Sequence, residues 1–320
     1  MISRRLLRIK ALMALYAFNR RQDDDLPRAE KELLFSIEKT YDLYFYILLL
    51  LVELSDIAAD RIDKALNKKM PTSEDLNPNR RFADNVLISQ IRKNSELKKY
   101  VSSSKLSWVN YSHVPRTIYN TLVSWDPYRL YMTSPENNYQ SDKKFILKLV
   151  NELLPDSEDL AGFLEEQSIY WNDDLEYVLV MIGKTLKKFR SASDDSITLM
   201  PLYKNHEDEE FVKQLFRKTV LHSGKNTELI ENNTTNWEIE RIALMDILVM
   251  QLAVTEIMEF PEIPVKVTLN EFIEIAKYYC TAKSSTFVNG ILDNIVKEIR
   301  EKGLFNKFGR GLVGEFSEEA

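Results

Sequence analysis

The sequence predicts an all-α protein. Glycine and proline are scarce, with 8 and 10 positions among 320, whereas leucine, isoleucine, lysine and glutamate abound. Apolar residues recur at helical spacing over long stretches without either helix breaker, above all between residues 29 and 66. A chain of this length has room for one large or two ordinary domains.

Breaks in the apolar pattern divide the chain into helical segments. Polar loops with Pro71, Pro78 and Pro115 follow the long stretch, which is one helix or two with a kink. Thr268, three positions before Glu271, predicts a capping box at a helix start. The expected helices cover residues 4–20, 29–66, 82–100, 115–133, 142–154, 157–168, 171–190, 207–222, 226–232, 237–258, 268–280 and 285–301, with a linker at 191–205.

The first 21 residues differ in charge from the rest of the chain. They hold six basic residues and no acid, whereas residues 22–320 hold 37 basic and 49 acidic residues. This asymmetry favours a polyanion that docks at the basic end. On a helix Arg4, Arg5 and Arg8 share one face, and guanidinium groups suit phosphates. A solvated helix start stays open, while the apolar run from Ala11 to Phe18 disfavours a targeting peptide.

Other features exclude several classes of protein. The single Cys280 excludes a disulfide framework, and three scattered histidines leave no zinc cluster of usual spacing, so no metal and no cofactor are expected. The longest apolar run, Leu43 to Val52, is too short to span a bilayer and predicts a buried helix segment. We therefore expect a soluble, cytoplasmic protein without membrane contact.

A second candidate for RNA contact opens the last predicted helix. Lys283, Ser284 and Ser285 precede an apolar run, and the free N–H groups of a helix start bind phosphate well. Phe287 in the first turn either stacks on an unpaired base or belongs to the core. Gly290 within the helix suggests a close helix crossing.

The sequence also contains a weak internal similarity. Shifted by 66 positions, residues 142–171 lie over 208–237, and Phe145 with Trp171 matches Phe211 with Trp237. An old duplication and convergence of two amphipathic helix pairs both explain it. A duplication predicts a separate helical bundle in the middle of the chain.

Two parts of the sequence together resemble the NusB family. Near the start, the spacing of the arginines and of Tyr16 is that of the family's arginine-rich first helix. The second half matches at Trp237, Arg241-Ile242, Asp246-Ile247-Leu248, Glu256, Ile263-Pro264, Asn270-Glu271, Ile275-Ala276-Lys277 and Phe287 to Asp293. The resemblance covers residues 2–20 and 207–300, and the inserted middle is similar to the long variety of Bacteroidetes-type bacteria.

The resemblance implies NusB-like helical bundles with an additional inserted helical domain. The expected parts are a first helix at 1–21, an inserted helical region at 22–205, a C-terminal core at 206–302 and a disordered tail at 303–320. The implied function is transcription antitermination, with boxA-type RNA, the small-subunit ribosomal protein NusE and the transcription elongation complex as partners. By position, the RNA-contacting residues are Arg4, Arg5, Arg8, Lys283, Ser284, Ser285 and Phe287, and the partner-contacting residues are Tyr16 and Asp246.

The chain departs from the family pattern at some positions, and other classes of function stay open. Gln251 and Thr286 stand where the family usually has basic residues, so RNA preference can differ. No phosphate loop, zincin motif or catalytic triad points to an enzyme. The alternative is a helical protein-interaction module that docks a basic partner without direct RNA contact. The RNA hypothesis predicts that the three arginines are exposed and adjoin the turn at Lys283–Phe287.

Overall fold

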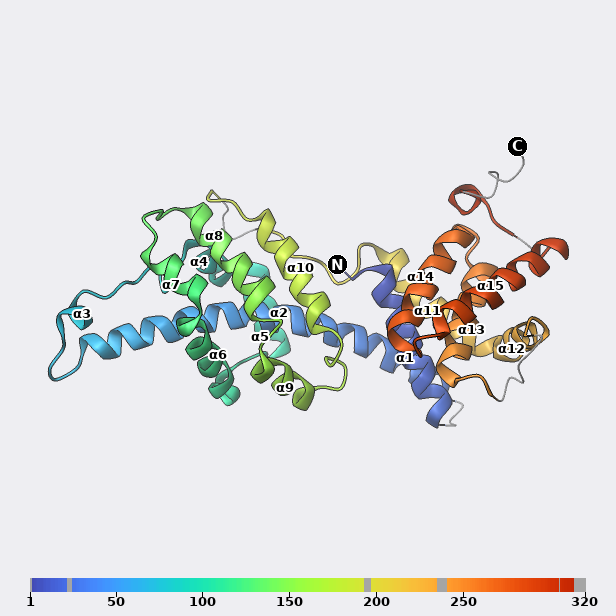
Figure 1. Ribbon diagram of the computed structural model, residues 1–320, viewed down its shortest axis with the longest axis horizontal. Helices are drawn as coiled ribbons and strands as arrows, with labels where there is room; N and C mark the ends of the chain where they lie inside the picture. The colour runs from blue at the N-terminus through green and yellow to red at the C-terminus, as the bar shows by residue number, and fades with distance from the viewer. Residues whose placement is uncertain (1, 22–24, 193–196, 235–240, 305, 314–320) are drawn as a thin grey trace. The chain divides into compact units, whose positions relative to one another are not determined.

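The computed structural model describes residues 2–21, 25–192, 197–234, 241–304 and 306–313 (Figure 1). Every regular element in this part of the chain is a helix, which confirms the predicted all-α class. The chain forms two compact units. The middle unit is Glu38–Leu202, and the terminal unit consists of Ile2–Ile37 and Tyr203–Ala320.

The middle unit is a helical bundle. Its buried centre is the second half of α2 (Leu26–Leu66), where the stretch from Leu43 to Val52 is almost entirely buried, as predicted. Aromatic rings pack on this helix; Tyr46 stacks on Trp108 with ring centroids 4.1 Å apart. The remaining elements are α3 (Ser73–Leu76), α4 (Val86–Lys93), α5 (Ser95–Ser104), η1 (Val109–Tyr111), α6 (His113–Ser124), α7 (Asp126–Thr133), α8 (Tyr139–Lys148), η2 (Leu149–Leu153), α9 (Glu158–Gln167) and α10 (Leu175–Lys188).

The terminal unit brings the two ends of the chain together. It contains α1 (Arg4–Arg21), the start of α2, α11 (His206–Leu221), α12 (Ser223–Asn232), α13 (Leu244–Glu259), α14 (Val265–Tyr279), α15 (Ser284–Glu301) and η4 (Gly309–Leu312). α13 is its central helix, because every residue from Leu248 to Ile257 is buried and α1, α11, α12, α14 and α15 all pack against it.

The first helix packs against the C-terminal helices, which confirms that prediction. In Figure 1 α1, drawn in blue, lies beside α11 and α13, and both helices contact it. Leu7, Leu12 and Leu15 of α1 are at most 1% exposed, so the apolar face of α1 is buried across an interface between distant parts of the sequence.

Several predicted helix boundaries were wrong. Asn94 splits the segment expected at 82–100, because it ends α4 and its side chain accepts a hydrogen bond from the N–H of Leu97 in α5. Trp125 separates α6 from α7. Thr268 does not cap a helix; α14 begins at Val265, directly after Pro264, and Thr268 lies within it. The helix thus starts three positions before the residue that the capping pattern marked, with Pro264 as its N-cap residue.

The expected disordered tail is ordered in part. The ammonium group of Lys307 donates to the carbonyl of Phe260 at 2.8 Å, and the N–H of Phe308 donates to that of Pro261. Gly311 is buried so close to this segment that an added Cβ would lie 2.0 Å from the carbonyl oxygen of Pro261. Glycine serves close packing here rather than flexibility. Residues 314–320 lie outside the described residues.

Only one of the two aromatic pairs in the internal similarity lies wholly within the described residues. Phe145 and Phe211 are both buried, each 4% exposed, on the helices α8 and α11. Trp171 is also buried, but its counterpart Trp237 lies outside the described residues. The duplication therefore stays a hypothesis.

Candidate functional site

Arg8 of α1 forms a buried ion pair with Glu256 of α13. Its Nε and one Nη each donate to a different carboxylate oxygen at 2.7 Å. The Arg8 side chain is 3% exposed and that of Glu256 is fully buried. Thr268 donates a further hydrogen bond to the same carboxylate at 2.7 Å. With its partners satisfied in this way, the pair joins α1, α13 and α14.

Arg4 and Arg5 form ion pairs nearer the surface. Arg4 Nε donates to Asp208 at 2.9 Å, and its guanidinium lies 5.0 Å from the ring centroid of Phe211. Arg5 makes a two-pronged contact with Glu271, with both hydrogen bonds at 2.8 Å. This contact raises the pKa of Arg5 and lowers that of Glu271. The two arginine side chains remain 37% and 49% exposed.

The prediction of three exposed arginines was therefore wrong for Arg8. A guanidinium on the buried face of α1 is stable only with a carboxylate partner, and Glu256 provides one. Arg4 and Arg5 line an open cavity of about 550 Å³ between α1 and the start of α14, which Arg310 of the C-terminal segment also borders. The cavity brings together Arg4 and Arg5, the two accessible arginines in the first turn of α1.

The start of α15 forms a second, separate cavity of about 340 Å³. Lys283 is exposed and Phe287 is half-buried, and both line it. Ser284 does not face solvent; it is 3% exposed, and its hydroxyl donates to Oδ2 of Asp246 at 2.8 Å. Ser285 is half-buried. Of these predicted RNA-contacting residues, Lys283 and Phe287 are the ones that the cavity exposes to a ligand.

Asp246 anchors this second cavity from α13. Its Oδ1 is buried without a hydrogen-bond partner among the described residues. Burial and the neighbouring Asp246 carboxylate raise the pKa of the Cys280 thiol, so the thiol stays protonated. Asp246 is only 7% exposed, and Tyr16, the other predicted partner contact, is half-buried beneath the Arg20 guanidinium, 5.8 Å from its ring centroid.

The two cavities lie toward opposite ends of α13. Glu256, the partner of Arg8, and Asp246, the partner of Ser284, are ten residues apart on this helix, which is about 15 Å along its axis. The prediction that the arginines of the first helix adjoin the turn at Lys283–Phe287 was therefore wrong, because the two segments contact α13 about 15 Å apart. A ligand that touches both must extend along the helix.

The sequence did not identify the carboxylates that pair with the arginines. Glu256 and Glu271 belong to the family pattern, Glu271 also to the expected capping box, and Asp208 lies at the start of the internal similarity, but the sequence does not assign any of them to a particular arginine. Their role depends on which helix faces α1, and the interface with α11 and α13 decides this. The one usable signal was an acidic residue in an apolar run such as that around Glu256, because a buried charge requires a partner.

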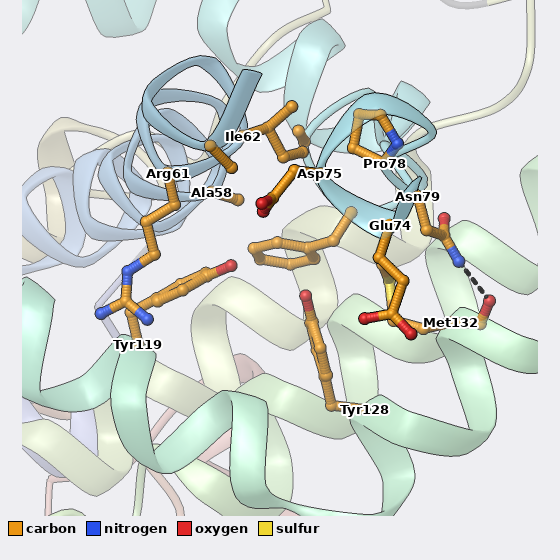
Figure 2. Close-up of a pocket in the computed structure, with 13 residues that line it drawn as sticks. Ala58, Arg61, Ile62, Glu74, Asp75, Pro78, Asn79, Tyr119, Tyr128 and Met132 are labelled. Carbon is orange, nitrogen blue, oxygen red and sulfur yellow. Dashed lines mark hydrogen bonds between the residues drawn. The ribbon is translucent and has the colours of Figure 1, made fainter. Parts of the chain in front are cut away.

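A third cavity, of about 230 Å³, lies in the middle unit (Figure 2). Figure 2 shows the hydroxyls of Tyr119 and Tyr128 pointing into it, with the carboxylates of Glu74 and Asp75 at its edge. Burial raises the pKa of Tyr128. The Arg61 guanidinium lies 4.6 Å from the ring centroid of Tyr119. A side chain of the protein therefore already occupies the cation–π position on this ring.

The described residues contain neither of two further kinds of site. No helix there combines the length and the apolar character needed to cross a membrane. Within the same ranges, no group of three or more histidine, cysteine, aspartate or glutamate side chains is placed to hold a metal ion.

Comparison with known proteins identifies the family. The NusB family model matches residues 178–297. The transcription antitermination protein NusB of Salinibacter ruber is 42% identical over 119 residues, which are 37% of this chain and 74% of that protein. The chain belongs to the NusB family. This confirms the family predicted from the sequence.

Other NusB proteins show the same partial coverage. The Chloroherpeton thalassium protein is 40% identical over 105 residues, covering 33% of this chain and 50% of that protein. The Natranaerobius thermophilus protein is 33% identical over 97 residues, covering 30% and 70%. The crystal structure of T. maritima NusB is 27% identical and covers 48% of this chain and 89% of its own, with a TM-score of 0.29. More than half of this chain therefore lies outside each of these matches.

Proposed function

We propose that this NusB-family chain is a transcription antitermination factor that binds boxA-type single-stranded RNA together with the ribosomal protein NusE in the transcription elongation complex. The observation that carries the proposal is the 42% identity to a protein named as an antitermination factor, across 74% of its length. In this proposal residues 22–205 are an insertion into the NusB core, and the protein acts in the cytoplasm without catalysing a reaction.

The second cavity supplies suitable chemistry for an unpaired nucleotide. Single-stranded RNA is held by cations on its phosphates and by aromatic rings on its bases. Lys283 and Phe287 border one cavity at the first turn of α15. The cavity is open enough to admit a base beside the ring, and the exposed lysine adjoins it.

Arg4 and Arg5 provide the second contact in this proposal. Both are paired, but exposed ion pairs contribute little net stability, so a phosphate can replace a carboxylate partner at small cost. Arg8 is assigned a structural role, because removing it from Glu256 would leave a buried charge. The two contacts are separated along α13, which suits an extended single strand.

A salt-dependent RNA titration with and without NusE tests the proposal. The wild type is expected to bind boxA-type RNA weakly alone and more tightly with NusE. Affinity should fall with salt at a log–log slope of about −0.7 for each phosphate contact. The variant Arg4→Gln/Arg5→Gln/Lys283→Gln should lose RNA affinity and keep its helicity and its NusE binding.

The alternative is an interaction module that docks a basic protein without touching RNA. It is favoured by one observation, since all three arginines already pair with carboxylates of the chain. Unchanged RNA affinity in the triple variant would support this alternative. A scrambled RNA of equal length serves as the control for sequence preference.

A further inference from the structure

The C-terminal half of α10 carries a cluster of lysines in the middle unit. Lys184, Lys187 and Lys188 are exposed and follow the i, i+3, i+4 spacing of one helix face. None of the three has a carboxylate within 4.0 Å in the described part of the chain. Like charges at this spacing repel one another, so the cluster weakens the helix that carries it.

Two other helices extend this cluster. Gln90 of α4 donates to the carbonyl of Arg190 at 2.9 Å, just beyond the end of α10. Lys93 is exposed one turn further along α4, on the same face as Gln90. Arg190 is exposed as well. We define the lysine patch as Lys93, Lys184, Lys187 and Lys188.

Lys143 of α8 lies at the base of the lysine patch. Its ammonium group donates to the carbonyls of Lys187 and Phe189 at 2.8 and 2.7 Å, so it caps the C-terminal end of α10. Burial lowers the pKa of Lys143, and the charge of Arg190 lowers it further. The carbonyls at this helix end are thus already paired with a cation of the chain.

A solvated helix end does not account for the whole patch. The helix dipole favours cations in the last turn, which covers Lys187 and Lys188. Lys184 lies before that turn, and Lys93 belongs to another helix whose end meets the same place. The convergence of α4, α8 and α10 therefore gathers more positive charge than any one helix end requires.

The charge of α10 is also polarised. Glu176 near its start is exposed and lies 12 residues, about 18 Å, before Lys188 along the same exposed stripe. α9 adds exposed acids, among them Glu165 and Glu166. A polyanion is therefore attracted to one end of the unit and repelled from the other, which orients it.

We propose that the lysine patch is a second RNA-binding surface that holds the sugar–phosphate backbone without reading bases. Lysines act as point charges on phosphates and suit this task. An acidic protein partner fits less well, since interfaces between proteins depend on buried aromatic or arginine anchors and the α10 face offers only the half-exposed Val180 among its lysines. This inference takes from the proposed function only that the ligand is RNA.

The test uses the full-length chain and two single-stranded RNAs of equal length, one containing boxA and one of uridine alone. The patch variant is Lys184→Gln/Lys187→Gln/Lys188→Gln. The control variant, Lys64→Gln/Lys69→Gln/Lys105→Gln, changes three exposed lysines elsewhere in the same unit by the same charge. Fluorescence anisotropy at several salt concentrations measures affinity, and circular dichroism checks that both variants fold.

The patch variant is expected to lose about tenfold in affinity for both RNAs, and its log–log salt slope should be shallower by about 2, the value for three phosphate contacts. The control should stay within about twofold of the wild type. Equal affinity of patch variant and wild type, with boxA preference retained, would overturn the lysine patch alone. If the patch variant has a shallower salt slope than the wild type but neither protein prefers the boxA RNA to the uridine RNA, the proposed function alone would be overturned.

Two other outcomes would also count against the patch. A wild type that binds neither RNA overturns both proposals. Binding of the wild type to phosphatidylglycerol vesicles that the patch variant loses, with RNA affinity unchanged, assigns the lysines to a membrane surface instead.

Discussion

Arg8 and Glu256, 248 positions apart in the sequence, form a buried two-pronged ion pair that joins α1 to α13. Arg8, which the sequence marks as a ligand-binding residue, thus holds two helices of the terminal unit together. Arg4 and Arg5 beside it remain partly exposed. The basic first helix therefore has a structural face and an accessible face.

Removing one partner of the buried pair should strongly destabilise the protein. Arg8→Met leaves the Glu256 carboxylate buried without its counter-ion, which costs about 3–5 kcal/mol. The double variant Arg8→Met/Glu256→Met removes both charges and should recover most of this loss. Calorimetric unfolding measures both. Arg5→Met is the control, because its exposed pair is worth at most about 1 kcal/mol; equal losses in Arg8→Met and Arg5→Met would contradict the structural role.

The Arg5–Glu271 pair should make stability depend on pH. The folded-state pKa of Glu271 is lowered, chiefly by its hydrogen bonds from Arg5. Its contribution is therefore present above the ordinary pKa of 4.5 and is lost as the pH falls through the lowered value. At pH 7 Glu271→Gln should be less stable by at most about 1 kcal/mol, and the difference should vanish as the pH falls below the lowered pKa of Glu271.

Melting temperatures from pH 3 to 7 check this dependence. Glu262→Gln is the matched control, because Glu262 borders the same cavity but has no ion-pair partner among the described residues. A difference between Glu271→Gln and wild type that grows toward low pH would refute the assigned sign.

Phe287→Ala should reduce RNA affinity more than stability. The ring is half-buried beside the second cavity, and loss of stacking on a base costs about 1–3 kcal/mol. RNA titration and thermal unfolding of the same variant separate the two effects. Val288→Ala, one position further along and fully buried, is the control and should mainly lower stability. The reverse pattern would place Phe287 in the core.

Gly290→Ala should stabilise the protein by about 0.5–1 kcal/mol. Outside its own stretch of helix, no heavy atom of the described residues lies within 4 Å of the added Cβ, so those residues do not show the close helix crossing expected from the sequence, and alanine favours the helix. Unfolding by urea measures the gain. A loss of stability would show that the surroundings of Gly290 are closer than described.

Gly311→Ala should have the opposite effect. Its Cβ would meet the Pro261 carbonyl at 2.0 Å, and this contact lies in the backbone, which moves only at a cost. We expect the segment around Lys307 to detach and become sensitive to protease, as mass spectrometry of cleavage products would reveal. Unchanged protection of residues 306–313 would refute the packing role.

The sequence by itself determined the helical class, the burial of the stretch from Leu43 to Val52 and the family of the chain. These follow from local propensity, from the period of the apolar residues and from motif spacing, which one segment displays without reference to another. The same signals predicted that α1 needs a distant partner, since its apolar face must be buried.

Only the tertiary structure decided how each charge is used. Whether Arg8 meets solvent or Glu256, and whether Ser284 meets a ligand or Asp246, depends on how helices far apart in sequence pack. The length of α13 then separates the two cavities. Likewise the glycine-rich segment around Gly311 has the composition of a flexible tail, but Gly311 packs closely against the carbonyl of Pro261. A burial pattern is local, whereas the partner of a charge is a property of the packed core.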